Sequence, residues 1–141
     1  MHSRVLKGFF IAGLGVAAWM PPAAKAHHSF SAEFDAQKVV TLDGTVVEME
    51  WVNPHSWLTI DVPKPDGTTE RWRIEGGSPS VLLRLGWNRN TLPKGTKIRV
   101  IANQAKDGSL RGSSRDIMFP DGRKMDLGGS GSKEGEKSAE K

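Results

Sequence analysis

The alternation of apolar and polar side chains predicts a protein built mainly from short β-strands. Between residues 39 and 51 the apolar positions repeat every two residues, as expected for a strand with one buried face. Leu42 has one parity, whereas Met49 and Trp51 have the other. A strand changes phase through a bulge or a bend, where glycine is common, so we expect the chain to bend at Gly44.

Two further alternating segments, residues 57–62 and 68–75, predict a β-hairpin. Residues 63–67 between them read Pro-Lys-Pro-Asp-Gly, a composition that is typical of a turn. The simplest register pairs Val62 with Thr68 across this turn. The apolar positions of both strands then share the inward face of the hairpin.

The same register gives the hairpin an outward face that carries aromatic and charged side chains. It places Trp57 opposite Arg73 and His55 opposite Glu75. A guanidinium over an indole ring contributes about 0.5–1 kcal/mol through cation–π attraction. We therefore interpret Trp57, Arg71, Arg73 and Glu75 as a candidate ligand platform with His55 at its end. The alternative is an ordinary solvated sheet face.

A short helix and two more strands complete the pattern. Residues 78–86 begin with a serine cap and a proline and end with a glycine, which are start and stop signals of a helix. Residues 96–103 and 110–119 read as strands. Three strands, a helix and two strands follow the element order of an OB-fold. We predict a mainly β fold, a small five-stranded OB-like barrel with one short helix between strands 3 and 4. An open meander or a small sandwich is the alternative.

The two ends of the chain depart from this pattern. The N-terminus has a basic start, a twelve-residue apolar run and an Ala-Lys-Ala motif, in the order of a secretory signal. The run is shorter than the roughly 20 residues that span a bilayer, and an uncleaved anchor or a buried helix is the alternative. The predicted organisation is a signal peptide (1–26), an N-terminal arm (27–36), the OB-like barrel (37–126) and a disordered polar tail (127–141).

Composition and charge narrow the classes of function. The formal net charge of +4 falls to +1 when the predicted signal removes Arg4, Lys7 and Lys25, since 20 basic residues become 17 against 16 acidic ones. A nearly neutral exported domain is a poor candidate for nucleic-acid binding, which depends on phosphate neutralisation. The absence of cysteine excludes disulfides, thiolate zinc sites and cysteine nucleophiles. We expect a periplasmic protein with no membrane span after cleavage.

The histidines provide a candidate metal site. Cleavage after Ala26 would make His27 the first residue, whose α-amine and imidazole can chelate one ion together, with His28 adjacent. Amine and imidazole nitrogens suit Cu(II). His55 would complete the site if the N-terminal arm folds back to it, with Glu75 orienting its ring. The alternatives are a terminus that binds copper weakly and a histidine that only caps a turn.

Other catalytic signatures are missing from the sequence. It contains no G-x-S-x-G elbow, no phosphate loop after a strand and no suitably spaced carboxylate pair. We therefore expect a non-enzymatic, exported binding module for a small molecule, a glycan or a peptide. The alternative is a protein that binds or handles copper, and an enzyme has the least support.

Several motifs resemble an uncharacterised family of small periplasmic proteins from Gram-negative bacteria, described only as a domain of unknown function. The most specific piece is Trp-Val-Asn-Pro-His at residues 51–55, and the resemblance extends over residues 27–123. It includes His-His-Ser-Phe at residues 27–30, Gly-Ser-Pro at 77–79 and Pro-Asp-Gly-Arg at 120–123. The resemblance implies an exported single-domain protein but no activity. The element order alone is loosely similar to small exported bacterial OB-fold proteins.

Overall fold

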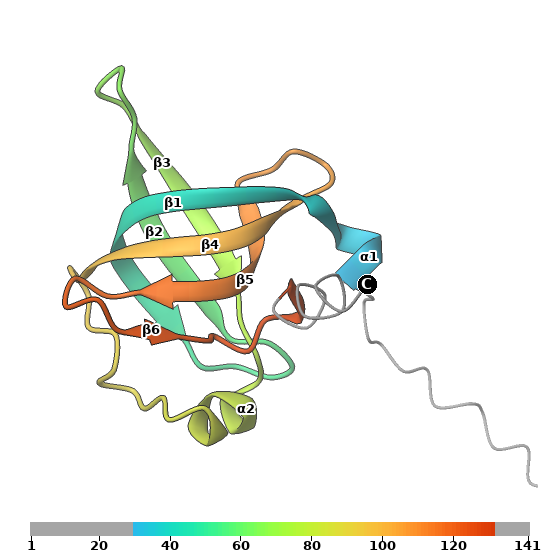
Figure 1. Cartoon of the computed structure of the whole chain (residues 1–141), viewed down its shortest axis with the longest axis vertical. Coiled ribbons are helices and arrows are strands. Elements are labelled where there is room, and N and C mark those ends of the chain that lie inside the picture. Colours follow the sequence, from blue (N-terminus) through green and yellow to red (C-terminus); the bar gives the residue numbers. More distant parts are fainter. Residues whose placement is uncertain (1–29, 132–141) are drawn as a thin grey trace, which may run out of the picture.

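The computed structural model describes residues 30–131, which form two short helices and six strands (Figure 1). In chain order these elements are α1 (Phe30–Glu33), β1 (Phe34–Glu50), β2 (Trp57–Pro63), β3 (Thr69–Glu75), α2 (Pro79–Arg84), β4 (Lys97–Ala105), β5 (Arg111–Met118) and β6 (Lys124–Met125). Residues 1–29 and 132–141 lie outside the described part of the chain. They include the predicted signal peptide, His27 and His28.

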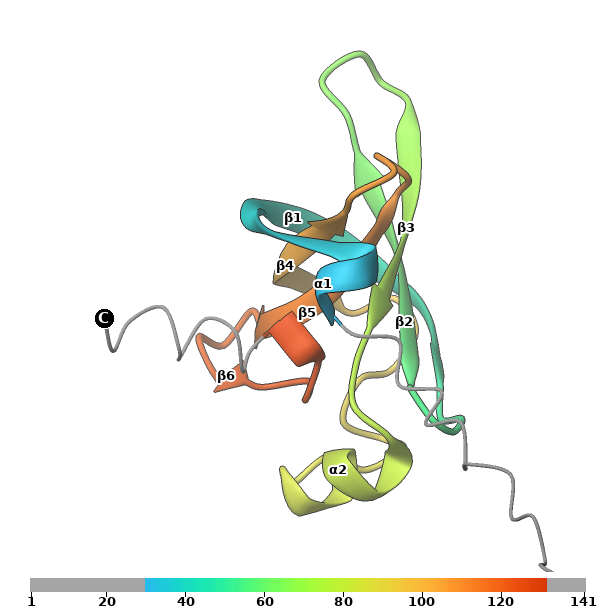
Figure 2. The same cartoon turned by 90° about the vertical axis from the view of Figure 1, so that its right-hand side faces the viewer.

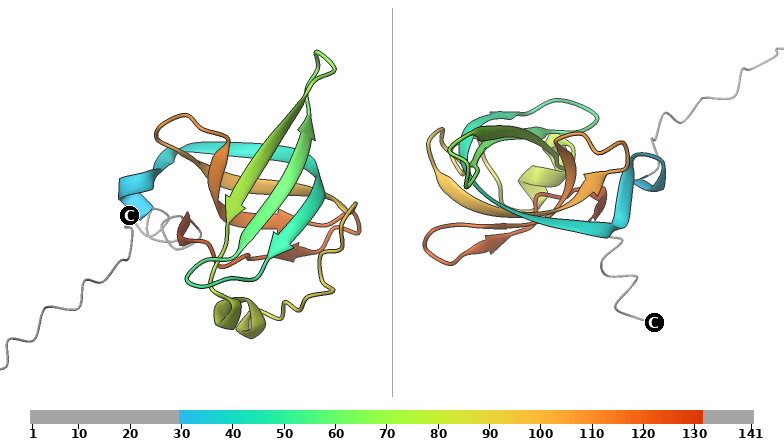
Figure 3. Two further views of the ribbon diagram at one scale, coloured as in Figure 1. Left: turned by 180° about the vertical axis from the view of Figure 1, so that it is seen from behind. Right: turned by 90° about the horizontal axis from the view of Figure 1, so that it is seen from above.

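Five of the strands form a ring. The sheet order is β3-β2-β1-β4-β5-β6, and a parallel pairing between β3 and β5 joins its two sides. The other neighbouring strands are antiparallel, and β6 extends the sheet outside the ring. Seen from above, these strands curve round into a ring (Figure 3). The predicted mainly β fold, with five strands in a ring and a short helix between the third and fourth, is confirmed.

The first strand joins the two sides of the ring because it pairs with β4 over its first half and with β2 over its second half. The register shift lies between Val46 and Glu48, so the prediction of a bend at Gly44 is wrong in position. Leu42, Gly44 and Val46 all face inward and are buried. A Cβ on Gly44 would lie 3.0 Å from the carbonyl oxygen of Asp61, so this glycine permits close strand contact instead.

The β2–β3 hairpin rises beyond the ring (Figure 1), and its register differs from the predicted one by two residues. Val62 pairs with Glu70 instead of Thr68, and Leu58 pairs with Ile74. The five-residue turn is centred one residue later than assumed, since Pro63 pairs with Thr69, and the amide of Lys64 donates to the carbonyl oxygen of Thr68. Because the difference is an even number, every side chain keeps its predicted face of the sheet.

The core fills the ring and extends to α2 at one end. Ser78 caps α2 by accepting a hydrogen bond from the amide of Val81, as the sequence predicts. Trp87 follows the helix, is almost fully buried, and donates from its indole nitrogen to the carbonyl oxygen of Asp126 at 2.7 Å. The buried cluster also contains Leu58, Ile60, Trp72, Ile74, Leu82, Val100, Ile117 and Leu127.

Both ends of the described chain pack more extensively than the sequence predicts. The first strand begins at Phe34, inside the predicted N-terminal arm, and this side chain is buried and stacks on Phe30. At the other end Leu127 is fully buried and Gly131 is buried as well. The ordered part therefore continues past the predicted limit at residue 126. Within residues 30–131, no helix is long and apolar enough to cross a membrane.

Candidate functional site

A row of outward-facing side chains runs around the ring across neighbouring strands. Trp57 of β2 pairs with Glu75 of β3, Glu75 pairs with Ser113 of β5, and Ser113 pairs with Asn103 of β4. Directly paired residues point to the same face of a sheet. Glu75, Ser113 and Asn103 are nonetheless buried, with 6%, 0% and 1% of their surface exposed. We refer to these three residues as the buried polar row.

The two ends of the described chain cover the buried polar row. On the N-terminal side, the Asn103 amide nitrogen donates to the carbonyl oxygens of Asp35 and Ala36, at 3.2 and 3.1 Å. On the C-terminal side, the Gly131 amide donates to the Ser113 hydroxyl oxygen at 3.0 Å, and the hydroxyl oxygens of Ser113 and Ser130 are 3.1 Å apart. Figures 1 and 2 show α1 and the C-terminal segment on the same side of the ring.

Glu75 is the titratable centre of this region. Its carboxylate oxygen Oε1 lies 3.4 Å from Nδ1 of His55, a side chain that is 36% exposed. Burial raises the pKa of Glu75 above its ordinary value, and the nearby Glu33 carboxylate acts in the same direction. His55, Arg111 and a hydrogen bond from Ser130 oppose this shift without reversing it. The structure thus brings His55 and Glu75 together, as the sequence predicts, in spite of the different register.

The exposed part of the platform consists of arginines that already have carboxylate partners. The Arg73 guanidinium carbon lies 4.5 Å from the centre of the Trp57 ring, and Nη2 is 2.9 Å from Oε2 of Glu50. Arg71 makes two hydrogen bonds to Asp61, at 2.8 and 3.0 Å, which lower the pKa of the Asp61 carboxyl. The predicted Trp57–Arg73 contact is present, although the two residues are diagonal and not directly opposite.

The family of this chain follows from a match over residues 16–114, which is more than half of its length. The chain belongs to the family of unknown function DUF6152. The DUF6152 match includes the platform, His55 and all three residues of the buried polar row. It ends inside β5, before the C-terminal segment that covers the row. This agrees with the resemblance to a domain of unknown function. Neither a curated protein nor a solved structure matches this DUF6152 chain.

The predicted metal ligands do not all fall within the described structure. His55 is described, whereas His27 and His28 are not. Within residues 30–131 there is no group of three or more histidine, aspartate or glutamate side chains that could hold a metal ion. His55 therefore needs further ligands from outside this range to form a metal centre.

The sequence did not predict Ser113, Ser130 or Asn103 as site residues.

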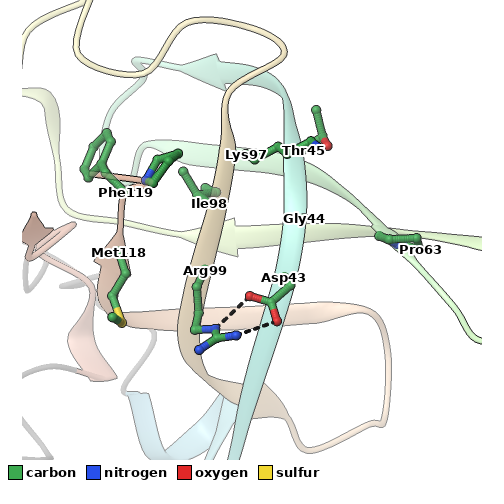
Figure 4. Close-up of a pocket in the computed structure, with 10 residues that line it drawn as sticks. Asp43, Gly44, Thr45, Pro63, Lys97, Ile98, Arg99, Met118 and Phe119 are labelled. Carbon is green, nitrogen blue, oxygen red and sulfur yellow. Dashed lines mark hydrogen bonds and ion pairs between the residues drawn. The ribbon is translucent and has the colours of Figure 1, made fainter. Parts of the chain in front are cut away.

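An open groove on another part of the ring was also not predicted from the sequence. This groove has a volume of about 460 Å³ (Figure 4). The Asp43–Arg99 pair, which has hydrogen bonds of 2.7 and 2.9 Å, is part of its lining. Its other lining residues come from β1, β2, β4 and the end of β5, and include Gly44, Thr45, Pro63, Lys97, Ile98, Met118 and Phe119.

Proposed function

We propose that this protein is an exported, non-enzymatic binding module that holds a glycan on the outward face of β2 and β3. We further propose that the ring is an OB-like barrel, an architecture in which this face binds oligonucleotides or oligosaccharides. The observation that carries the proposal is the contact of Trp57 with Arg73 and, through it, Glu50 on this face. An amphipathic ring beside a donor and an acceptor is suited to a sugar.

The charges of the platform favour a neutral ligand over an acidic one. Arg73 and Arg71 are both paired with carboxylates, so a polyanion would have to displace Glu50 and Asp61. A sugar hydroxyl is both donor and acceptor, and it can bind a guanidinium and a carboxylate without separating them. Of the small molecules, glycans and peptides that the sequence admits, neutral glycans fit this arrangement best.

Calorimetric titration of the mature protein with maltohexaose, cellohexaose and chitohexaose tests this proposal, with an oligogalacturonate as the acidic comparison. We expect at least one neutral oligosaccharide to bind. We also expect Trp57→Ala to weaken that binding by about tenfold, which corresponds to about 1.4 kcal/mol. The matched control is Arg99→Ala, since Arg99 is also an exposed, ion-paired arginine but lies in the other groove. Binding of none of the neutral sugars, or equal binding by both variants, would contradict the proposal.

A copper-binding function is the second candidate, and the His55–Glu75 contact is the specific observation in its favour. A carboxylate beside one ring nitrogen fixes the tautomer of an imidazole and leaves the other nitrogen for a metal. His28 precedes Phe30, the first residue of α1, by two positions in the sequence. The same helix carries Glu33, whose charge acts on Glu75.

Titration with Cu(II), followed by electron paramagnetic resonance, tests the copper hypothesis. Mass spectrometry of the exported protein first establishes whether His27 is the N-terminal residue and whether the protein is periplasmic. We expect His55→Gln, and separately one extra residue ahead of His27, each to weaken copper binding. Equal affinity and equal spectra in all three proteins would rule out this candidate and leave the glycan proposal unaffected.

A further inference from the structure

The C-terminal segment Gly128–Gly131 fits the surface above the buried polar row only because it is rich in glycine. A Cβ on Gly129 would lie 2.5 Å from the carbonyl oxygen of Ser114, and a Cβ on Gly131 would lie 2.7 Å from Oδ1 of Asn103. The first of these contacts is with backbone, which cannot move aside easily. At these two positions the segment therefore lies closer to the sheet than a residue with a side chain could.

This segment follows directly on a residue that is anchored in the core. Leu127 is fully buried in the core, and its carbonyl oxygen accepts a hydrogen bond of 2.8 Å from the amide of Gly77. Gly128 follows with a φ of +69°, a conformation that glycine adopts without strain. The chain can therefore pivot after Leu127 while Leu127 itself remains in place.

The contacts beneath the segment are hydrogen bonds, and one buried acceptor beneath it is unsatisfied. Ser113 and Ser130 link the segment to the sheet, and Ser130 also donates to Glu75. By contrast, Asn103 Oδ1 has no hydrogen-bond partner within residues 30–131. A buried acceptor without a partner is costly, and exposure to water would remove that cost. Opening of the segment would therefore relieve one unsatisfied buried acceptor while it breaks these hydrogen bonds.

We propose that Gly128–Gly131 form a strap that pivots after Leu127 and, when open, exposes the buried polar row as an extension of the platform. Trp57 and Glu75 are direct partners across β2 and β3, so the newly exposed groups continue the same line of side chains. The opening itself is independent of any ligand, and only its use in binding rests on the proposed function.

Protonation of Glu75 favours the closed form of the strap. The groups that face Glu75 come from every element around it: His55 before β2, Glu33 of α1, Arg111 of β5 and Ser130 of the strap. Together with burial they leave the pKa of Glu75 raised in the closed form. An exposed glutamate in the open form has an ordinary pKa, so the closed form binds the proton more tightly. Acidic pH favours the closed strap, and a rise in pH through the raised pKa favours opening.

Native-state amide exchange of the full-length mature protein, followed by NMR without any sugar or metal, tests this proposal. The reporters are the amides of Gly131 in the strap, Gly77 at the anchor and Val100 in β4. After correction for intrinsic rates, we expect Gly131 to exchange on the order of 100-fold faster than Gly77 and Val100. We expect its protection to increase as the pH is lowered.

Two variants complete the test. Glu75→Gln should remove the pH dependence of Gly131 protection, whereas Glu50→Gln, a change of the same kind on the exposed face, should preserve it. Exchange of Gly131 in step with Gly77 and Val100 at every pH would show that the strap opens only when the whole domain unfolds. That result, or an unchanged pH dependence in Glu75→Gln, would overturn the proposal. Neither outcome bears on whether a glycan binds.

Discussion

The outward face of β2 and β3 contains two regions of opposite character. In the exposed region, Arg71 and Arg73 pair with carboxylates in contact with water. One residue further along the same face, Glu75 begins the buried polar row, which the two ends of the described residues, 30–131, cover. The strands are the same in both regions. The environment of a side chain on this face is therefore decided by segments that are remote in the sequence.

The pKa shifts of the carboxylates have opposite directions in the two regions. The Arg71 guanidinium lowers the pKa of Asp61, whereas burial raises the pKa of Glu75. An ion pair in water favours the charged form, and removal from water favours the neutral form. The exposed region is therefore expected to be insensitive to substitution, and the buried polar row is expected to be sensitive to both substitution and pH.

The largest effect is expected for Asn103→Ala. The substitution leaves the carbonyl oxygens of Asp35 and Ala36 without their donor and creates a small cavity. We expect the free energy of unfolding to fall by about 2–4 kcal/mol. Urea denaturation measures this change, with the exposed Asn90→Ala as the control. A loss below about 0.5 kcal/mol, typical of surface sites, would show that the row is not structurally buried.

A smaller effect is expected for Gly129→Ala. The added Cβ conflicts with the Ser114 backbone and forces the strap outward. The loss is limited by the strap's own closing free energy, so we expect about 1–2 kcal/mol, at the lower end of overpacking effects. The control is Gly67→Ala, where φ is +83° and no atom lies within 4 Å of the new Cβ. Gly67→Ala is strained by its positive φ and lowers stability as well, so Gly131 amide exchange separates the two variants, because only Gly129→Ala should accelerate that exchange. Equal exchange in both variants would contradict this prediction.

The pH dependence of stability should have opposite signs in the two regions. We expect its amplitude to be smaller than the effect of Gly129→Ala. The raised pKa of Glu75 stabilises the fold below the unfolded pKa of about 4.3, and this contribution is lost as the pH rises through the folded value. The lowered pKa of Asp61 stabilises it above about 3.9, and this contribution is lost as the pH falls through the folded value. Urea denaturation of Glu75→Gln and Asp61→Asn across this range should remove the two slopes separately. Identical slopes in both variants would refute the distinction.

The smallest effect is expected for Arg71→Ala. Its partner Asp61 remains accessible to water, and exposed ion pairs contribute little to stability. We expect a loss below about 0.5 kcal/mol by urea denaturation, both in low salt and in 1 M sodium chloride. A clear, salt-dependent loss would mean that the exposed region is part of the structural framework instead of a binding surface.

The sequence could predict the faces of the hairpin but not its register. Alternation alone separates Leu58 and Ile74 from Trp57 and Arg73, and a shift by two residues preserves that separation. For the same reason the contact between His55 and Glu75 could be anticipated. The partner of Arg73 could not, because Glu50 reaches it only through the pairing of β1 with β2.

The buried polar row could not be predicted for a different reason. Ser113 and Asn103 have the parity of outward-facing polar residues, which normally meet water. Their burial results from the start of β1 and from the strap, and the strap contains no apolar side chain that could indicate packing. A glycine-rich segment is usually interpreted as a flexible tail, and only the close backbone contacts reveal that it packs here.

Amide chemical-shift changes during titration of the isotope-labelled protein with the neutral oligosaccharides test the central claim most directly. Binding at the platform predicts that the largest shifts fall on Trp57, Thr59 and Arg73, and that they continue to Glu75. Shifts confined to Asp43, Lys97, Arg99 and Met118 would place the ligand in the groove on the other part of the ring instead. That pattern, or no shifts with any sugar, would contradict a glycan-binding role for the β2–β3 face.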